Sequence, residues 1–190
     1  MIVVTGGAGF IGSCIVAKLN TFGWDNITIV DHLENNDLKR ENIKKKRYTH
    51  YLDKTDFLRA ILDDKVDTKV ESIIHMGACS DTTGTDANLY EENNFLYTKH
   101  LAQWCLKKGV RFIYASSAAT YGDGNEGYCY DEATIRRLKP LNLYGASKQK
   151  FDIWALDQKV LDKMVGLKFF NVFGPNEYHK GRMASVIFHA

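Results

Sequence analysis

Tyr144 and Lys148 are the residues whose spacing points most directly to proton chemistry. They begin and end the run YGASK, which opens a predicted helix. Residues four positions apart share one face of a helix, so the Lys148 ammonium is expected beside the Tyr144 phenol. A free tyrosine, with a pKa near ~10, is a poor base at neutral pH, but a neighbouring cation lowers that pKa. The pair is therefore a candidate acid–base group for a substrate hydroxyl.

Ser116 and Ser117 supply hydroxyl groups that can hold the same substrate oxygen. They follow the run from Arg111 to Ala115, which reads as a strand. Open α/β sheets bind ligands outside the carboxyl ends of their strands, where these serines lie. We expect one of the two to hold a substrate hydroxyl or carbonyl while hydride moves. A Tyr-x-x-x-Lys spacing occurs often by chance, and the serines and the glycine turn described next give it weight.

A glycine-rich turn, TGGAGFIG, joins a short apolar run to a segment of helical period. In such a turn Gly6 and Gly7 allow the tight reversal of the chain. Gly9 lets the backbone approach a pyrophosphate, and Gly12 lets the following helix pack close to the sheet. The pyrophosphate would rest on the free N–H groups at the start of that helix. The turn therefore predicts a dinucleotide site.

Acidic and basic residues after the second and third predicted strands bear on which dinucleotide is bound. Asp31 follows Gly12 by nineteen residues, where an acidic side chain meets the adenosine ribose and favours NAD. His32, Lys39 and Arg40 lie just downstream and could instead neutralise the 2′-phosphate of NADP. These residues leave the choice between NAD and NADP open. Asp53 could accept a hydrogen bond from the adenine amine.

The elements that must position these groups alternate between strand and helix. Strands are predicted at residues 2–5, 27–31, 48–52, 72–75, 111–115 and 165–171. Helices are predicted after the glycine turn to Gly23, around residues 57–62, and over 86–108 and 147–161, with residues 122–143 as an irregular loop. Strand–helix repetition requires right-handed crossovers. The fold class is therefore α/β, with a doubly wound parallel sheet.

Composition excludes several classes of protein. The chain has 190 residues, a formal net charge of +2 and a hydrophobic fraction of 45%, which are globular values. No charge excess suggests a nucleic-acid partner, and no apolar run reaches the ~18 residues of a membrane span. The four cysteines, at positions 14, 79, 105 and 129, match no metal-site spacing and are expected to be free thiols packed as small hydrophobes. We therefore expect no metal site and a cytoplasmic location.

The motifs together resemble the extended short-chain dehydrogenase/reductase family, whose Rossmann-type members mostly modify nucleotide sugars. Four further runs narrow the resemblance to the branch that epimerises ADP-heptoses. They are GACS at 77–80, YASSAATYG at 114–122, FNV at 170–172, and GPNEYHKG at 174–181 followed by MAS at 183–185. The resemblance spans nearly the whole chain, and its most specific part is the HKG-x-MAS stretch.

The resemblance implies a dinucleotide site and a cofactor. Its residues would be Phe10, Ile11, Asp31, His32, Lys39, Lys54, Met76, Gly77, Ala78, Cys79, Ser80, Asn93, Lys148 and Val172. Family members mostly carry NADP, so NADP is favoured and NAD remains possible. Lys39 and Lys54 are the candidate phosphate partners.

The resemblance also implies catalytic and substrate residues. Ser117, Tyr144 and Lys148 match the catalytic set, and Lys180 matches a second base. Besides the two serines, the residues near the sugar nucleotide would be Asn171, Arg182 and His189.

The implied activity is inversion of C6″ of an ADP-glycero-manno-heptose by transient oxidation and re-reduction, a step in making heptose precursors of the lipopolysaccharide core. Another nucleotide-sugar 4-epimerase or a dehydratase is the runner-up, although Ala118 and Ala119 offer no dehydratase acid–base pair. A non-catalytic NAD(P)-sensing module is a third hypothesis. A fragment that binds cofactor without turnover is a fourth.

Two units are expected along the chain. Residues 1–172 would form the dinucleotide-binding domain, and residues 173–190, with a helix over 183–190, would begin a truncated substrate-binding lobe. Members of the family continue well past this length, so we expect the chain to be a fragment. At full length we expect a homo-oligomer.

Overall fold

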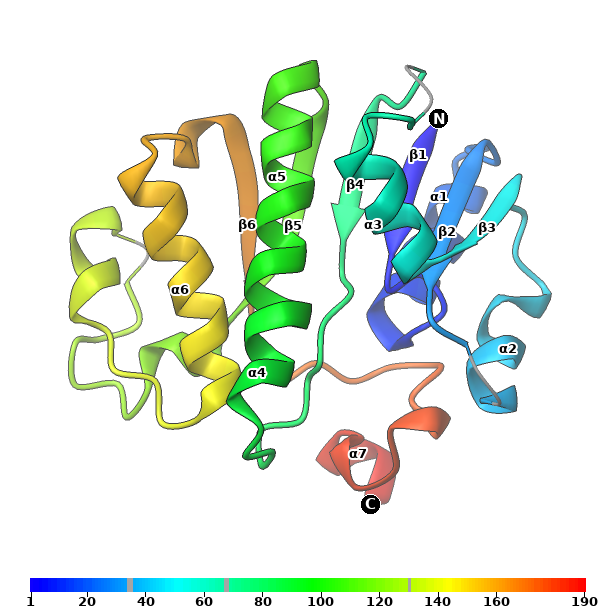
Figure 1. Ribbon diagram of the computed structural model, residues 1–190. Coiled ribbons are helices and arrows are strands. Elements are labelled where there is room, and N and C mark those ends of the chain that lie inside the picture. The colour runs from blue at the N-terminus through cyan, green and yellow to red at the C-terminus, as the bar shows by residue number, and fades with distance from the viewer. Residues whose placement is uncertain (34–35, 67–68, 130) are drawn as a thin grey trace.

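The computed structural model describes residues 1–33, 36–66, 69–129 and 131–190. One sheet of six parallel strands, in the order β3-β2-β1-β4-β5-β6, forms its centre (Figure 1). The strands are β1 (Ile2–Thr5), β2 (Ile27–Asp31), β3 (His50–Asp53), β4 (Ser72–His75), β5 (Arg111–Ser117) and β6 (Met164–Phe169). This order is that of a doubly wound Rossmann-type sheet, and the predicted fold class is confirmed.

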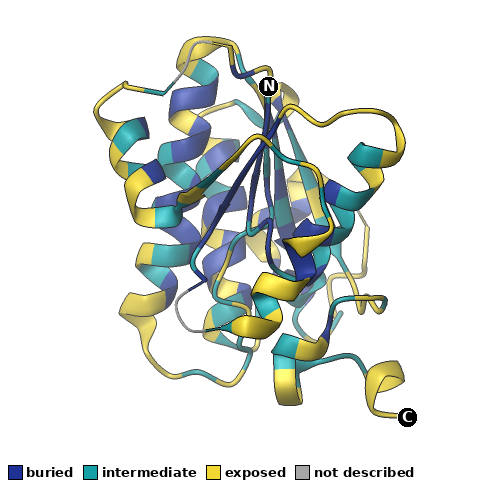
Figure 2. Ribbon diagram, turned by 90° about the vertical axis from the view of Figure 1, so that its right-hand side faces the viewer, coloured by how far each residue is buried: buried dark blue, intermediate teal, exposed yellow. Residues whose placement is uncertain are grey.

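Helices cover both faces of the sheet. The α-helices are α1 (Phe10–Thr21), α2 (Asp37–Lys44), α3 (Lys54–Leu62), α4 (Ala87–Tyr90), α5 (Tyr97–Lys108), α6 (Leu143–Asp157) and α7 (Val186–His189). One core packs Phe57, Leu101 and Phe151, from α3, α5 and α6, against the sheet. A smaller core on the other face contains Val16 of α1 and Ile43 of α2. The strands between the two cores are mostly buried (Figure 2).

The structure differs from the sequence prediction in several elements. Helix α2 was not predicted, because its eight residues are mostly polar and carry only one buried apolar side chain, Ile43. The predicted loop 122–143 contains a 3-10 helix, η3 (Glu132–Arg137), which Asp131 caps. Two further 3-10 helices are η2 (Ala118–Tyr121), directly after β5, and η4 (Leu161–Lys163), before β6. The predicted helix 147–161 begins earlier, at the Asn142 cap, and β6 ends at Phe169 rather than residue 171.

The long helix predicted over 86–108 is interrupted by a π-helical turn, η1 (Glu91–Leu96). Such turns widen a helix by one residue and are frequent at functional sites. Here the extra residue lets two adjacent side chains bond to different elements. Asn93 accepts a hydrogen bond from Lys54, and Asn94 bonds to the backbone of Cys79 and to Ser147. The periodicity of apolar residues does not reveal this turn, because the apolar face continues through it.

After β6 the chain crosses below the carboxyl ends of the strands and returns to α1 and α2 (Figure 1). It contains a 3-10 helix, η5 (Tyr178–Met183), and only the short α7, so the predicted helix 183–190 begins at Val186 instead. Buried Glu177 fixes the segment by accepting hydrogen bonds from Gly174 and Ser185. Burial raises the pKa of Glu177, but these bonds outweigh it and hold that pKa below its usual value.

His75 is a fully buried polar group at the carboxyl end of β4. Its Nε2 lies 2.8 Å from the hydroxyl of Thr98, which donates to the Asn94 carbonyl, so Nε2 carries the hydrogen. Its Nδ1 then accepts the hydroxyl hydrogen of Thr5 at 2.5 Å. Burial, aided by the charge of Lys148, lowers the pKa of His75 to about 3.

The buried His75 predicts acid sensitivity of the fold. Between pH 6.5 and about 3 the unfolded chain binds a proton at this histidine and the native chain does not. The free energy of unfolding should therefore fall with decreasing pH in this window, by up to about 1.4 kcal/mol per pH unit from this group. Urea denaturation at several pH values measures how steeply the free energy of unfolding falls with decreasing pH. This dependence should be weaker for His75→Gln than for wild type, while exposed His50→Gln should keep the wild-type dependence. Equal slopes for all three proteins would contradict the assignment.

Candidate active site

The glycine turn joins β1 to α1 through a close backbone crossing. Gly6 has a φ of +65°, and a Cβ there would lie 2.6 Å from the Gly77 nitrogen. A Cβ on Gly12 would lie 2.1 Å from the Gly6 carbonyl oxygen. Both glycines are therefore required by the protein's own packing. By contrast, a Cβ on Gly9 would approach only the Gly6 oxygen, at 3.2 Å, which leaves its outer side open.

The N-terminus of α1 is suited to hold an anion. Gly9 is its N-cap and supplies no side-chain hydrogen bond. The described helices α2, α3, α4, α6 and α7 are all capped by an Asn, Asp or Ser side chain. The first N–H groups of α1 can therefore bond to a phosphate, and the helix dipole favours negative charge there.

A cavity of about 240 Å³ opens beside this turn, where the connections of β1 and β4 diverge. This is the switch point at which doubly wound sheets bind their ligands. The cavity is lined by Thr5, Gly6, Val30, Asp31, His32, Lys39, Lys54, Gly77, Ala78, Cys79, Leu89, Asn93 and Tyr97. Nine of these residues are among the predicted cofactor residues, so about half of that set converges on one site.

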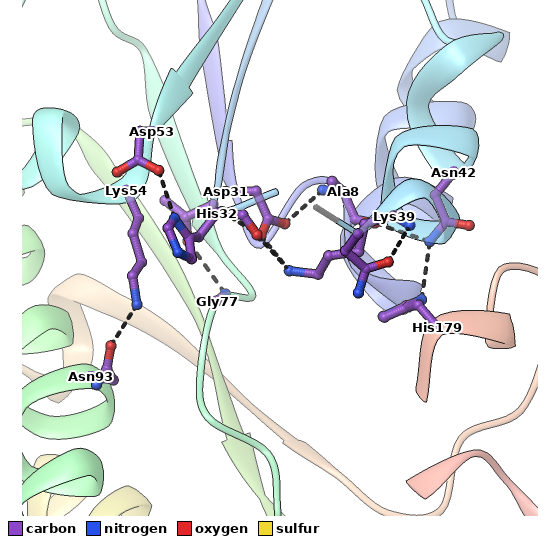
Figure 3. Close-up of polar contacts among 12 residues, drawn as sticks. Ala8, Asp31, His32, Lys39, Asn42, Asp53, Lys54, Gly77, Asn93 and His179 are labelled. Carbon is purple, nitrogen blue, oxygen red and sulfur yellow. Dashed lines mark hydrogen bonds and ion pairs between the residues drawn. The ribbon is translucent and has the colours of Figure 1, made fainter. Parts of the chain in front are cut away.

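Asp31 lies at the inner wall of this cavity and is already satisfied by the protein (Figure 3). Its Oδ2 accepts the Ala8 N–H of the glycine turn at 2.9 Å. Its Oδ1 accepts from the Lys39 ammonium at 2.7 Å and from the His32 N–H at 2.7 Å. The carboxylate therefore holds the turn in place, and Lys39 balances its charge.

Two further contacts form the outer wall of the cavity (Figure 3). The Lys54 ammonium donates to the Asn93 side-chain carbonyl at 2.8 Å. His32 Nδ1 lies 2.8 Å from Asp53 Oδ2, and the other Asp53 oxygen caps α3 through the Thr55 N–H. The hydrogen bond to His32 is the main cause of the lowered pKa of Asp53. Asp53 thus serves to hold His32 and to cap α3, and the adenine contact predicted for it stays a prediction.

The other predicted cofactor residues lie outside the cavity lining. They are Gly7, Gly9, Phe10, Ile11, Gly12, Asp53, Met76, Ser80, Lys148 and Val172. Leu89 and Tyr97 line the cavity and were not predicted, because in the sequence they read as apolar positions of a helix. The fold alone brings them to the site.

Ser117 and Tyr144 meet at the carboxyl end of β5. The Ser117 hydroxyl hydrogen-bonds to the Tyr144 phenol, and Cys79 of the cavity wall lies close enough to influence the same group. Burial raises the pKa of Tyr144, and the bond from Ser117 opposes that rise. The expectation that Lys148 would bring this pKa down is wrong for this structure, because the Lys148 ammonium donates instead to the Ala115 carbonyl at 2.8 Å.

Lys148 is buried below Tyr144 on α6. Burial lowers its pKa to about 8, and the carboxylate of Asp152 opposes this shift. Its ammonium is therefore mostly charged at neutral pH and loses its charge as the pH rises through about 8, so its charge is sensitive to any anion that binds beside it.

The two strand-end serines point in different directions. Ser117 bonds to Tyr144, whereas the Ser116 hydroxyl donates to the buried Asp152 carboxylate at 2.8 Å. Both serines were predicted from the sequence to lie near the substrate. Successive side chains of a strand, however, alternate between its faces. The structure therefore places only Ser117 with Tyr144, and the prediction for Ser116 is corrected to a role in the core.

Asn94 fastens the catalytic helix to the cavity wall. Its side-chain oxygen accepts the Cys79 N–H at 2.8 Å, and its nitrogen donates to the Cys79 carbonyl and to Ser147. Ser147 in turn donates to the Tyr144 carbonyl at 2.7 Å. The spacing between Tyr144 and the cavity is thus fixed by one side chain that sequence reasoning missed.

The residues predicted after β6 lie on the returning segment. The Lys180 ammonium is 5.4 Å from the centre of the Phe10 ring, at the start of α1. Arg182 donates to Thr83 at 2.7 Å and pairs with Asp81. The other three residues of this group are exposed, namely Asn171, Val172 and His189. Lys180 is thus brought to the glycine turn, while Arg182 bridges to the loop after β4.

The sequence of the chain decides the family. Residues 2–190 match the NAD dependent epimerase/dehydratase family. The chain belongs to this family. The resemblance drawn from the motifs is thereby confirmed, and the glycine cradle and cavity fit the dinucleotide that the family name implies.

Curated relatives can be aligned with nearly the whole of this chain. The ADP-L-glycero-D-manno-heptose-6-epimerase of Nitratidesulfovibrio vulgaris (strain DP4) is 52% identical over 187 residues, which are 98% of this chain and 58% of the relative. The protein of the same name from Fusobacterium nucleatum is 52% identical over 192 residues, and the alignment covers 100% of this chain and 58% of the relative. The chain therefore spans less than two thirds of the length of these relatives.

Solved structures of the family share the fold. The Helicobacter pylori ADP-L-glycero-D-manno-heptose-6-epimerase superposes with a TM-score of 0.82 at 29% identity, over 99% of this chain and 60% of that one. The Thermus thermophilus UDP-glucose 4-epimerase, in complex with NAD, gives a TM-score of 0.70 at 31% identity. This superposition covers 92% of this chain and 56% of that one.

Other features of the described residues bear on partners. No helix among them is long and apolar enough to cross a membrane. They contain no group of three or more His, Cys, Asp or Glu side chains able to hold a metal ion. All four cysteines are free thiols; Cys105 is buried as expected, but Cys129 is exposed, contrary to the predicted packing.

Gly9→Ala tests the dinucleotide cradle. The added methyl group needs only a small shift of the Gly6 carbonyl, 3.2 Å away, but it projects toward the pyrophosphate position, so the Kd for NADP or NAD should rise at least tenfold, about 1.4 kcal/mol. Calorimetry measures the affinity and circular dichroism the fold. Gly12→Ala is the contrasting variant, because its methyl group collides with the Gly6 carbonyl and should lower the melting temperature. Unchanged affinity in a folded Gly9→Ala protein would disprove the cradle.

The pKa of Lys148 predicts how dinucleotide affinity depends on pH. The charged ammonium of Lys148 attracts an anion such as the dinucleotide. The ammonium loses its charge, and the attraction is lost, as the pH rises through about 8. The Kd should therefore increase between pH 7 and 9.5, by up to about tenfold for each unit by which binding raises the pKa. Lys148→Met should bind more weakly at pH 7 and without this pH dependence, while Lys150→Met, on the exposed side of α6, should behave as wild type. A flat wild-type profile would refute the contact.

Proposed function

We propose that this protein inverts C6″ of an ADP-glycero-manno-heptose by transient oxidation and re-reduction with bound NADP. The observation that carries the proposal is the meeting of two sites at Cys79. This residue lines the dinucleotide cavity, and its backbone is joined through the side chains of Asn94 and Ser147 to the carbonyl of Tyr144. The names of the relatives at 52% identity supply the sugar nucleotide.

When bound, the dinucleotide supplies an acceptor and donor of hydride at its nicotinamide. The chain's own residues would hold the substrate and move the proton. Ser117 would hold the C6″ oxygen, and Tyr144 would take its proton as the carbon is oxidised and return a proton on reduction. The positive charge of the oxidised nicotinamide would offset the burial that raises the pKa of Tyr144.

Inversion needs proton transfer on two faces of the sugar, and Lys180 is the proposed second acid–base group. It is half-buried and reaches the start of α1, on the side of the cavity opposite to α6. The buried Glu177 fixes the turn that carries it. Asn171, Arg182 and His189 are proposed to contact the sugar nucleotide.

NADP is preferred over NAD in this proposal because of the charges around Asp31. A free carboxylate there would repel a 2′-phosphate, but both of its oxygens are already occupied and Lys39 neutralises it at 2.7 Å. Lys39 and Lys54 both line the cavity and would bind the phosphate.

The whole protein is proposed to be a cytoplasmic homo-oligomer in which residues 173–190 begin the substrate-binding lobe. Val186, Ile187 and Phe188 of α7 are all exposed apolar side chains, as expected where further chain packs against a helix.

Two variants test the chemistry in a protein extended to the length of its relatives. Tyr144→Phe should lower kcat for epimerisation of ADP-heptose by about 10²- to 10⁴-fold and leave the Kd for NADP nearly unchanged. Lys180→Met should lose epimerisation but still support oxidation or dismutation of one C6″ configuration. The assay follows both epimers and their aldehyde analogues separately by NMR.

Two outcomes would count against this scheme. Wild-type turnover in Lys180→Met would exclude the second base. Activity of the unmodified protein on UDP-glucose rather than ADP-heptose would favour a 4-epimerase, the activity named for the Thermus thermophilus relative.

A further inference from the structure

A buried ion pair lies behind the candidate catalytic residues. Asp152 of α6 and Lys168 of β6 meet with a distance of 2.9 Å between Oδ2 and Nζ. Their side chains are only 4% and 13% exposed. Neither residue belongs to the motifs that identified the site, and neither lines the dinucleotide cavity.

Every oxygen of the Asp152 carboxylate has a partner. Oδ1 accepts the Tyr114 hydroxyl at 2.9 Å, and Oδ2 accepts the Ser116 hydroxyl at 2.8 Å as well as the Lys168 ammonium. Lys168 also donates to the Thr120 hydroxyl at 2.8 Å. One carboxylate thus joins helix α6 to strands β5 and β6 and, through Lys168, to the turn η2.

The pair hydrogen-bonds to side-chain hydroxyls of residues on both sides of Ser117. Ser116 precedes it in β5, and the Thr120 hydroxyl that accepts from Lys168 donates to the Ser117 carbonyl at 2.8 Å. Asp152 also follows Lys148 by one helical turn, on the same face of α6. The network therefore contacts strand β5, which carries Ser117, and helix α6, which carries Lys148, without entering the cavity.

Stability alone is a weak reason for such a pair. Desolvation of two charges cancels much of their attraction, and apolar side chains of similar size often stabilise a core as well or better. What an apolar pair could not supply is the directional bonding to Ser116 and Thr120 and a negative charge beside Lys148, which opposes the effect of burial on that ammonium.

We propose that Asp152 and Lys168 are positioning residues, which hold Ser117 and Lys148 in register across β5 and α6 and place a carboxylate one helical turn from the Lys148 ammonium. The inference deepens the proposed function and rests on it for its catalytic part. His75 of β4 is the other titratable group coupled to Lys148, and it stays neutral above pH 5 because its pKa is about 3.

The double variant Asp152→Asn, Lys168→Met tests the proposal, since it removes both charges together and leaves none unpaired. The pH midpoint is the pH at which half of the pH-dependent rise in the Kd for NADP has occurred. In the double variant this midpoint should lie at lower pH than in wild type, because Lys148 loses its carboxylate neighbour. In the extended protein kcat should fall at least tenfold, with KM for the sugar nucleotide changed less than threefold. Lys168→Arg, which keeps the charge and can pair with Asp152, should retain the wild-type midpoint and most of kcat.

A wild-type pH midpoint and kcat in the folded double variant would reduce the pair to a structural role and overturn the proposal. If that variant does not fold, Asp152→Asn with Lys168→Gln, which also removes both charges but keeps a donor at residue 168, carries the same measurements. The midpoint of NADP binding does not involve the sugar. A wild-type protein inactive on ADP-heptose would therefore refute the proposed function, while the midpoint would still decide the role of the pair.

Discussion

The close crossing of Gly6 and Gly77 is the constraint on which the rest of the site depends. The turn after β1 and the turn after β4 pass so near each other that a side chain at Gly6 would collide with the backbone of Met76 and Gly77. The dinucleotide cavity opens beside this crossing, between the carboxyl ends of β1 and β2 and the loop after β4. Asp31 then ties the glycine turn to β2 through the Ala8 N–H.

Buried polar side chains set the geometry around this crossing. His75 joins Thr5 to Thr98, and Asn94 joins the Cys79 backbone to the helix that carries Tyr144. Each partner is satisfied, and among the described residues no buried side-chain nitrogen or oxygen lacks a hydrogen bond. Satisfied networks of this kind specify one arrangement of a core, because any shift leaves a desolvated group unpaired.

Charges in the core follow a related pattern. Lys148, Asp152 and Lys168 alternate in sign between α6 and the strands beside it. Burial pulls the Lys148 pKa down to about 8, and the carboxylate of Asp152 opposes that shift. A proton-transfer site requires groups that titrate near working pH, and here burial and one neighbouring charge supply that condition.

The sequence by itself determined the sheet, the glycine turn and the Tyr-x-x-x-Lys pair, because local periodicity and fixed spacing specify these features. It also determined the family, and it named nine of the residues that line the cavity. Only the tertiary structure decided that Ser116 faces the core while Ser117 meets Tyr144, that Lys148 bonds to Ala115, and that a π-helical turn aims Asn93 and Asn94 at different elements. It alone brought Leu89 and Tyr97 to the cavity and paired Asp152 with Lys168. The physical reason is that these contacts join residues far apart in the chain, whose distances are set by packing across the sheet, and no local pattern of residue types encodes such distances.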